Sequence, residues 1–243
     1  MLVLGVDGCR EGWVVVALED GAFAGASRVD TFDEVMALGE SAHAVGVDMP
    51  IGLVARGART CDKRVQAELG PRRSSVFAVP PRSALMEASY ADANAACARL
   101  AGFGLSKQLW NLKAKIVEVD ASLARARRRA RVVPPDGRRE AQAVGVERVV
   151  EVHPEASFRE LAGAPLADGK KSYDGVMRRL ALLEGAGIVM PRVLSIGRVG
   201  VDDVLDAAAA AWSARRVALG AARRLPDTGP EQRDRGRTVA IWI

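Results

Sequence analysis

Three strand-like segments joined by tight turns open the chain, and this order limits the folds that it can adopt. Apolar residues dominate residues 1–6 and 13–18, and a weaker apolar stretch covers 22–29. The dipeptide Asp20-Gly21 between the second and third segments is typical of a hairpin turn. The sequence therefore predicts an antiparallel meander of three strands at the start of the fold.

A helix and further short strands are predicted after the meander. Thr31 and Glu34 form a capping box at the start of a helix over 32–38. Short apolar runs at 44–48 and 148–152 then predict a fourth and a fifth strand. A meander followed by parallel strands that alternate with helices is the order of ribonuclease-H-like folds, whereas every strand of a Rossmann fold alternates with a helix. We therefore expect an α/β fold with a mixed five-stranded sheet flanked by helices.

The region between the fourth and fifth predicted strands is too long for an ordinary connection. Residues 49–105 are rich in polar and turn-forming residues, so we expect an inserted cap of short helices there. A helix is predicted from Ser106 to Ala130, because apolar residues recur every three or four positions, and a loop follows at 134–137. With this insertion, residues 1–243 are expected to form a single domain.

Two more helices and a last strand are predicted towards the end of the chain. Residues 172–184 and the alanine-rich segment 201–224 have helical patterns. The apolar run 238–243 follows a charged connector that contains proline and glycine, and it predicts a strand.

Aspartates stand at the ends of the first and fourth predicted strands. Asp7 follows the first apolar run, and Asp48 closes the short run that begins at residue 44. Because the carboxyl ends of neighbouring parallel strands meet at one edge of a sheet, where α/β proteins bind ligands, these carboxylates are expected to converge. Such a pair repels unless a cation or a proton lies between its members, and oxygen ligands favour Mg²⁺ or Mn²⁺. Either aspartate alone would suit an ordinary turn, but the matched pair favours a shared metal.

A third acidic element lies on the alanine-rich helix. Asp203 and Asp206 are three residues apart and share a face of that helix, and Asp202 and Asp206, four apart, could serve in the same way. The alanines that follow allow close packing against a sheet, which would place the start of the helix over the strand ends. The alternative is that these aspartates only complement the helix dipole, which explains Asp202 and Asp203 better than Asp206.

The motif Glu-Val-His-Pro-Glu ends the fifth predicted strand. Glu151 and His153 are expected on one face of that strand. Both are candidate catalytic residues, since His153 can act as a general base or a metal ligand near neutral pH. An equally good interpretation of His153 is a structural histidine at a strand end.

Several cations are candidates for binding the phosphate oxygens of a substrate. Arginines in the predicted insertion can clamp a phosphate with two hydrogen bonds. The net charge of +5 suits an anionic partner such as nucleic acid or a phosphorylated metabolite, although an arginine-rich proteome would give the same balance. For each residue alone, ordinary surface charge is the simpler interpretation. The main candidates are Arg59, Arg64, Arg82, Lys107, Lys171 and Arg179, with Arg72, Arg73 and Lys170 as further ones.

The cysteine content and the hydropathy of the chain indicate its cellular location. Cys9, Cys61 and Cys97 are an odd number without close spacing, which argues against a disulfide framework and against a cysteine-rich zinc site. The sequence has no apolar run of membrane-spanning length, and Asp7 comes too early for a signal peptide. We therefore expect a cytoplasmic protein with no membrane partner. Only 5% of the residues are aromatic, so the chain has few side chains on which the bases of single-stranded nucleic acid could stack.

Six motifs, in order along the chain, resemble a known family. They are GVDGCREGWVVV, VGVDMPIGL, RTCDKRVQAELGPRRSSVFAVPPR, GLSKQLWNLKAKIVEVD, VVEVHPE and VLDAAAAAWSA. These motifs look like the domain of unknown function 429 family, whose members are described as predicted nucleases of the ribonuclease-H fold. The resemblance covers nearly the whole chain.

The resemblance implies a nuclease that depends on Mg²⁺ or Mn²⁺. Ribonuclease-H-like nucleases hold metal with acids on the first strand, the fourth strand and the last core helix, and Asp7, Asp48, Asp203 and Asp206 fit those positions. Metal bound there would activate water and stabilise the leaving oxygen of a phosphodiester in nucleic acid. Asp48 departs from the glutamate that is common at this point in resolvases, and its shorter side chain favours one tightly held metal over two.

Other classes of function stay open. In sugar kinases and actin-like ATPases, an Asp-Gly turn between the first two strands holds nucleotide phosphate and metal, and Asp7-Gly8 fits that description. Those proteins contain two copies of the core domain, whereas this sequence has one strand–turn–strand unit of this kind. The alternatives to a nuclease are thus a nucleotide- or phosphometabolite-binding protein of that superfamily, or a non-catalytic binding protein.

Overall fold

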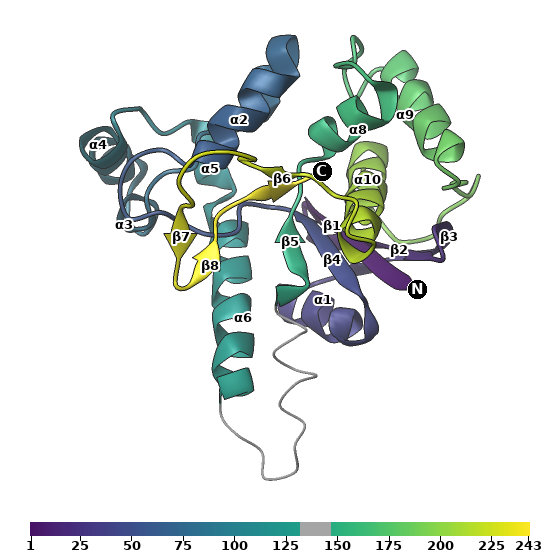
Figure 1. The fold of residues 1–243 in the computed structure, drawn as a ribbon, viewed down its shortest axis with the longest axis horizontal. Helices are drawn as coiled ribbons and strands as arrows, with labels where there is room; N and C mark the ends of the chain where they lie inside the picture. Colours follow the sequence, from purple (N-terminus) through teal and green to yellow (C-terminus); the bar gives the residue numbers. More distant parts are fainter. Residues whose placement is uncertain (132–146) are drawn as a thin grey trace.

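A five-stranded sheet forms the centre of the computed structural model, which describes residues 1–131 and 147–243 (Figure 1). Its strands are β1 (Leu2–Cys9), β2 (Gly12–Glu19), β3 (Ala22–Val29), β4 (Ala44–Asp48) and β5 (Val149–Glu151). Their order in the sheet is β3-β2-β1-β4-β5. The first three strands are antiparallel, and β4 lies parallel to both β1 and β5. This order confirms the mixed sheet that the sequence predicts.

The described helices include some that cover the faces of the sheet and others that belong to the insertion. They are α1 (Phe32–Leu38), α2 (Thr60–Leu69), α3 (Arg82–Leu85), α4 (Tyr90–Ala101), α5 (Lys107–Asn111), α6 (Lys113–Arg131), α8 (Pro154–Ala162), α9 (Tyr173–Gly185) and α10 (Val201–Ala218). The predicted cap begins α1, where the Glu34 amide donates to Thr31 Oγ1 at 3.3 Å. The return bond of a capping box is displaced by one residue, because Glu34 Oε2 accepts from the Asp30 amide at 3.1 Å and not from the amide of Thr31.

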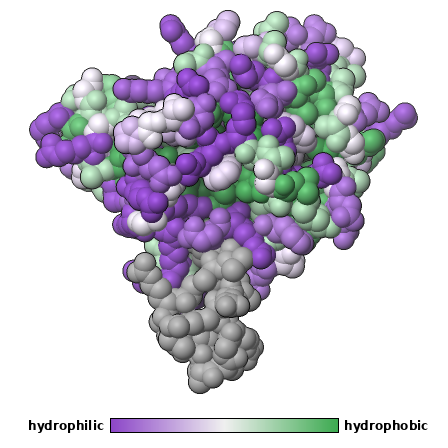
Figure 2. Space-filling view, viewed as in Figure 1, coloured by the Kyte–Doolittle hydropathy of each residue, from purple (hydrophilic) through white to green (hydrophobic). Residues whose placement is uncertain are grey.

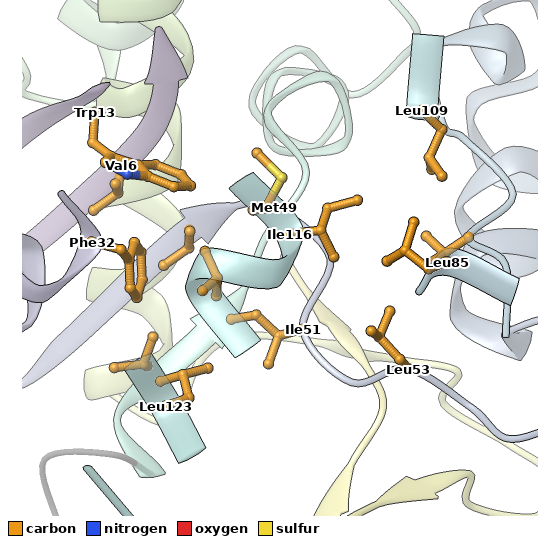
Figure 3. Close-up of a cluster of buried hydrophobic side chains, with 14 of the residues drawn as sticks. Val6, Trp13, Phe32, Met49, Ile51, Leu53, Leu85, Leu109, Ile116 and Leu123 are labelled. Atoms are coloured by element: carbon orange, nitrogen blue, oxygen red, sulfur yellow. The ribbon is translucent and has the colours of Figure 1, made fainter. Parts of the chain in front are cut away.

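Apolar side chains of α1 and α6 pack against one face of the sheet. Val6 of β1 joins Phe32 and Ile116 in this cluster, and Trp13 meets Phe32 edge to face with ring centroids 5.0 Å apart (Figure 3). Glu118 of α6 satisfies the polar atoms there: its Oε2 accepts from Trp13 Nε1 at 3.2 Å, and its Oε1 accepts from the Phe32 amide at 2.5 Å. The two rings are therefore buried without an unpaired indole N–H.

Helix α10 covers the opposite face and lies directly on the two central strands. A Cβ on Gly46 of β4 would lie 2.5 Å from the carbonyl oxygen of Ala210. A Cβ on Gly5 of β1 would overlap the backbone of Ala207 and Ala211. Glycine on the strands and alanine on the helix thus bring the two backbones into contact, as the alanine run predicts. Helices α8 and α9 pack against α10 in turn.

The insertion shares a core with the end of the chain. Four short strands form there, in the pairs β6 (Arg224–Leu225) with β9 (Ile241–Trp242) and β7 (Arg233–Asp234) with β8 (Arg237–Thr238). Cys61 and Leu69 of α2 pack with Leu225 and Ile241 in one buried cluster. Figure 1 shows this C-terminal segment, in yellow, running between the helices of the insertion and β5.

The first strand continues past residue 6 to Cys9, so Asp7 lies within β1. Three further boundaries differ from those expected from the sequence. The last helix ends at Ala218, because the chain turns at Gly220 with a φ of 68° and then enters β6. The strand expected over 238–243 shrinks to β9, which pairs with β6; its Trp242 also makes a parallel bridge to Val152, just beyond β5.

The third difference concerns the long helix of the central region. The helix expected from Ser106 is divided at Leu112 into α5 and α6, and Leu112 is the C-cap of the shorter helix. The loop predicted at 134–137 lies outside the described residues.

Candidate metal centre and its cavity

Asp7, Asp48 and Asp206 converge at the carboxyl ends of the two central strands. Asp7 and Asp48 are register partners on β1 and β4, and both face α10, as Gly5 and Gly46 do two residues earlier. Asp206 lies in the second turn of α10. One carboxylate oxygen from each aspartate lies within 4.8 Å of the others. The predicted convergence of strand-end aspartates under the start of an alanine-rich helix is therefore present.

Burial and mutual repulsion act on these three carboxyl groups. Burial raises the pKa of Asp7 well above its usual range, and the charges of Asp48 and Asp206 raise it further. The pKa of Asp48 is raised well above its usual range by burial first and then by Asp206. Burial also raises the pKa of Asp206, which Lys170 opposes. The cluster thus carries more negative charge than its surroundings balance, and three carboxylate donors suit a hard divalent cation.

Lys170 is the cation that lies at this cluster. Its Nζ is 2.6 Å from Asp206 Oδ2 and 3.8 Å from Asp202 Oδ2. Burial alone would lower the pKa of Lys170, but Asp206 and the other aspartates raise it on balance, so the side chain stays charged. Lys171, predicted to bind substrate, points to Asp202 at 3.6 Å instead and is 80% exposed. Both lysines are candidates from the sequence, but no sequence pattern indicates that Lys170, and not Lys171, contacts the acidic cluster.

Asp203 lies near the three converging aspartates without joining them. It lines the same cavity, one turn before Asp206 on α10. Its pKa is raised by burial and by the neighbouring Asp202. The structure thus brings three of the four predicted metal ligands within reach of one ion and leaves Asp203 at the cavity wall.

A cavity of about 350 Å³ opens above the three aspartates. Its walls include Ser75, Val76, Phe77 and Val79, which belong to the predicted insertion. Leu112, Val152 and Ile241 line other parts, together with His153 and Glu155. The insertion therefore supplies part of the wall around the acidic cluster, where a cap was expected.

Glu151 has a structural network of its own within the wall of this cavity. Its Oε1 lies 2.5 Å from Arg59 Nη2, and its Oε2 accepts from the Ile51 amide at 2.7 Å. Burial raises the pKa of Glu151 to about 7, although Arg59 opposes the rise. Glu151 thereby fixes the turn that follows Asp48, which is a positioning role.

His153 keeps one ring nitrogen without a partner. Its Nε2 lies 3.2 Å from the carbonyl oxygen of Ser75, which accepts the proton of this nitrogen. Its Nδ1 is buried and has no hydrogen-bond partner among the described residues. Burial lowers the pKa of His153, so the ring is neutral at neutral pH with a lone pair on Nδ1. A proton-accepting atom thus belongs to a residue that lines the cavity.

The other predicted phosphate-binding cations have different partners. Arg59 is fully buried, 2.5 Å from Glu151 and 3.1 Å from Asp62. Arg64 pairs with Asp227 at 3.3 Å, and Arg179 pairs with Glu155 at 2.8 Å. Arg82 lies 2.5 Å from Asp120 and 2.6 Å from Asp234. Lys107 Nζ lies 5.9 Å from the ring centroid of Tyr90. None of these five cations is among the described residues that line the cavity.

The fold and the acidic cluster together define an α/β protein with a metal-compatible site at the carboxyl ends of its central strands. The family model described as "Protein of unknown function (DUF429)" matches residues 5–231, and the chain belongs to this family. The comparisons with curated proteins and with solved structures gave no match. Within the described part of the chain, no helix combines the length and the apolar character needed to cross a membrane.

Proposed function

We propose that this protein is a nuclease that hydrolyses phosphodiester bonds with Mg²⁺ or Mn²⁺. The observation that carries the proposal is the convergence of Asp7, Asp48 and Asp206 within 4.8 Å at a cavity. These three residues would hold the metal, and Asp203 is the nearest further acid on α10. The expected cytoplasmic location is part of the proposal, and three free, buried cysteines support it.

The metal would polarise a phosphoryl oxygen and lower the pKa of a bound water. The chain's own residues contribute orientation and proton transfer. His153 lines the cavity, and its buried Nδ1, which has no hydrogen-bond partner among the described residues, carries a lone pair that can accept a proton. Glu151 and Arg59 hold the turn after Asp48, and Lys170 offsets part of the negative charge next to Asp206.

A cleavage assay with matched variants tests this proposal. Labelled DNA and RNA, as single strands, duplexes, hybrids and branched junctions, are incubated with the full chain and Mg²⁺ or Mn²⁺, or with EDTA. Cleavage that needs the metal and is lost in Asp7→Asn is the expected result, because asparagine keeps the shape but removes a ligand charge. Asp174→Asn is the control, since Asp174 is an exposed aspartate on α9.

Two outcomes would contradict the proposal. Cleavage that survives in the Asp7→Asn protein would place the activity elsewhere or in a contaminant. Absence of cleavage across all substrates, with calorimetric binding of nucleotide, would favour the nucleotide- or phosphometabolite-binding alternative.

A further inference from the structure

Two of the three converging aspartates are buried at the cavity, and Asp48 is half-buried. Asp7 is 6% exposed and Asp206 is 3% exposed, so a phosphate that reaches them has to enter the cavity. A volume of about 350 Å³ lies at the lower end of the range for small-molecule pockets. A paired duplex cannot place one of its nucleotides in such a space without unstacking and unpairing it, which costs free energy.

The cavity has a mixed lining that suits one nucleotide. Val76, Phe77 and Val79 from the insertion and Leu112, the C-cap of α5, give it an apolar wall. Phe77 is the one Phe, Tyr or Trp among the described residues that line it, and His153 supplies the other aromatic ring. A nucleobase presents a flat π-face to such a ring, and stacking of this kind does not depend strongly on which base is present.

The charges around the cavity do not suit a long strand. Among the described lining residues, Lys170 is the one Lys or Arg. A strand that binds along its length needs several cations facing successive phosphates. Figure 2 shows hydrophilic residues over much of one face of the molecule, but Arg59 and Arg179 are already held by Glu151 and Glu155, two of the carboxylates that line the cavity. The lining carboxylates are Asp7, Asp48, Asp62, Glu151, Glu155, Asp203 and Asp206.

We propose that the cavity receives a single nucleotide unit, either a free nucleotide or the end of a single strand, with its base on Phe77. The placement of its phosphate at the three converging aspartates rests on the nuclease function proposed above. An internal position of a closed or paired strand reaches these aspartates only when one nucleotide is turned out of the strand, which costs free energy, so the enzyme would act preferentially from strand ends.

A comparison of linear and circular single strands tests the need for an end. The full chain with Mn²⁺ is given a labelled oligonucleotide and the same sequence ligated into a circle. The expected result is release of mononucleotides from the linear strand while the circle stays intact. Cleavage of the circle at the rate of the linear strand would overturn the inference and leave the nuclease proposal standing. Release of inorganic phosphate from a nucleoside monophosphate, without attack on the linear strand, would identify the free nucleotide as the source.

Calorimetry gives a readout that does not depend on activity. Nucleoside monophosphate and inorganic phosphate are titrated into the protein with Mn²⁺. Nucleotide should bind more tightly than phosphate, and Phe77→Ala should remove about tenfold or more of that preference. Phe23→Ala, on the outer strand β3, should leave it unchanged.

The calorimetric results also separate the two proposals. Equal affinity for nucleotide and phosphate, or no effect of Phe77→Ala, would overturn the nucleotide inference. Tight nucleotide binding that depends on Phe77, without cleavage of any ester, would refute the nuclease and keep the nucleotide site.

Discussion

Gly5 and Gly46 are register partners on the two central parallel strands, and both meet the backbone of helix α10. Two residues further along, the same pairing brings Asp7 beside Asp48. Because α10 cannot lie this close to strands that carry a Cβ, the glycines also set the distance of Asp206 from the strand ends. The packing of the core and the geometry of the acidic site therefore depend on the same contact.

Gly46→Ala tests this dependence. The added Cβ would lie 2.5 Å from the Ala210 carbonyl oxygen, so α10 must move away from β4. We expect a loss of about 1–3 kcal/mol in the free energy of unfolding, together with weaker Mn²⁺ binding. Urea unfolding and calorimetry measure the two effects. Gly25→Ala is the control, because a Cβ at this position of β3 would meet nothing within 4 Å; an unchanged Mn²⁺ affinity in Gly46→Ala would show that the site does not depend on this contact.

The pH dependence of stability reports on the acidic cluster in the absence of metal. Burial raises the pKa of Asp7, Asp48 and Asp206 in the folded state, so the folded protein binds more protons than the unfolded chain. Glu151 acts in the same direction between its ordinary value of 4.5 and about 7. Stability should therefore fall as the pH rises through the mildly acid range, the reverse of the effect of a carboxylate whose pKa is lowered.

Asp7→Asn should reduce this pH dependence. It removes one of the mutually repelling charges, so at neutral pH in EDTA the variant should be more stable than the natural protein by about 1 kcal/mol. Urea unfolding at a series of pH values measures both the slope and the difference. A variant with the same slope as the natural protein would mean that Asp7 is not part of the repelling cluster.

Lys170→Met should tighten the binding of Mn²⁺. The Lys170 ammonium group lies 2.6 Å from Asp206 Oδ2, so it occupies a ligand oxygen and adds a positive charge that repels the metal. Its removal should strengthen binding by about tenfold or more in a calorimetric titration. Lys171→Met serves as the comparison, since that side chain is 80% exposed and should have little effect. Weaker binding in Lys170→Met would instead assign the lysine a role in holding Asp206 in place.

Arg59→Met should destabilise the protein strongly. Arg59 is fully buried between Glu151 and Asp62, and its loss leaves buried carboxylates without their cation. Breaking such a buried pair costs about 3–5 kcal/mol, whereas Arg64→Met removes a half-exposed pair worth about 0–1 kcal/mol. Adding Glu151→Gln to Arg59→Met should recover part of the loss. Chemical denaturation of the four proteins checks the order, and equal stability of the two single variants would contradict it.

Local sequence patterns predict the sheet and the converging aspartates well, and the reason is physical. Alternation and turn residues identify the strands, and parallel neighbours necessarily end at the same edge, so Asp7 and Asp48 meet. The alanine run of α10 likewise indicates close packing, and this places Asp206 over the strand ends. Each of these features can be predicted from the pattern of one segment, or from the rule that neighbouring parallel strands end at the same edge of a sheet.

Partners distant in the chain could not be predicted in the same way. Arg59 and Glu151 are 92 residues apart, and each charge by itself looks like a candidate for binding substrate. The pairing of the final apolar run could not be predicted either. Its partner strand β6 has no strand pattern of its own, and the two strands pair where they share a core with α2. The choice of Lys170 over Lys171 depends on which of two adjacent side chains points inward.

The position of bound Mn²⁺ shows directly whether Asp7, Asp48 and Asp206 hold a metal. Crystals of the protein soaked in Mn²⁺ can be measured at a wavelength where the ion scatters anomalously. We expect an anomalous peak between the carboxylates of Asp7, Asp48 and Asp206, with Lys170 moved away from Asp206. Absence of a peak there at saturating Mn²⁺, with Lys170 still bonded to Asp206, would contradict it.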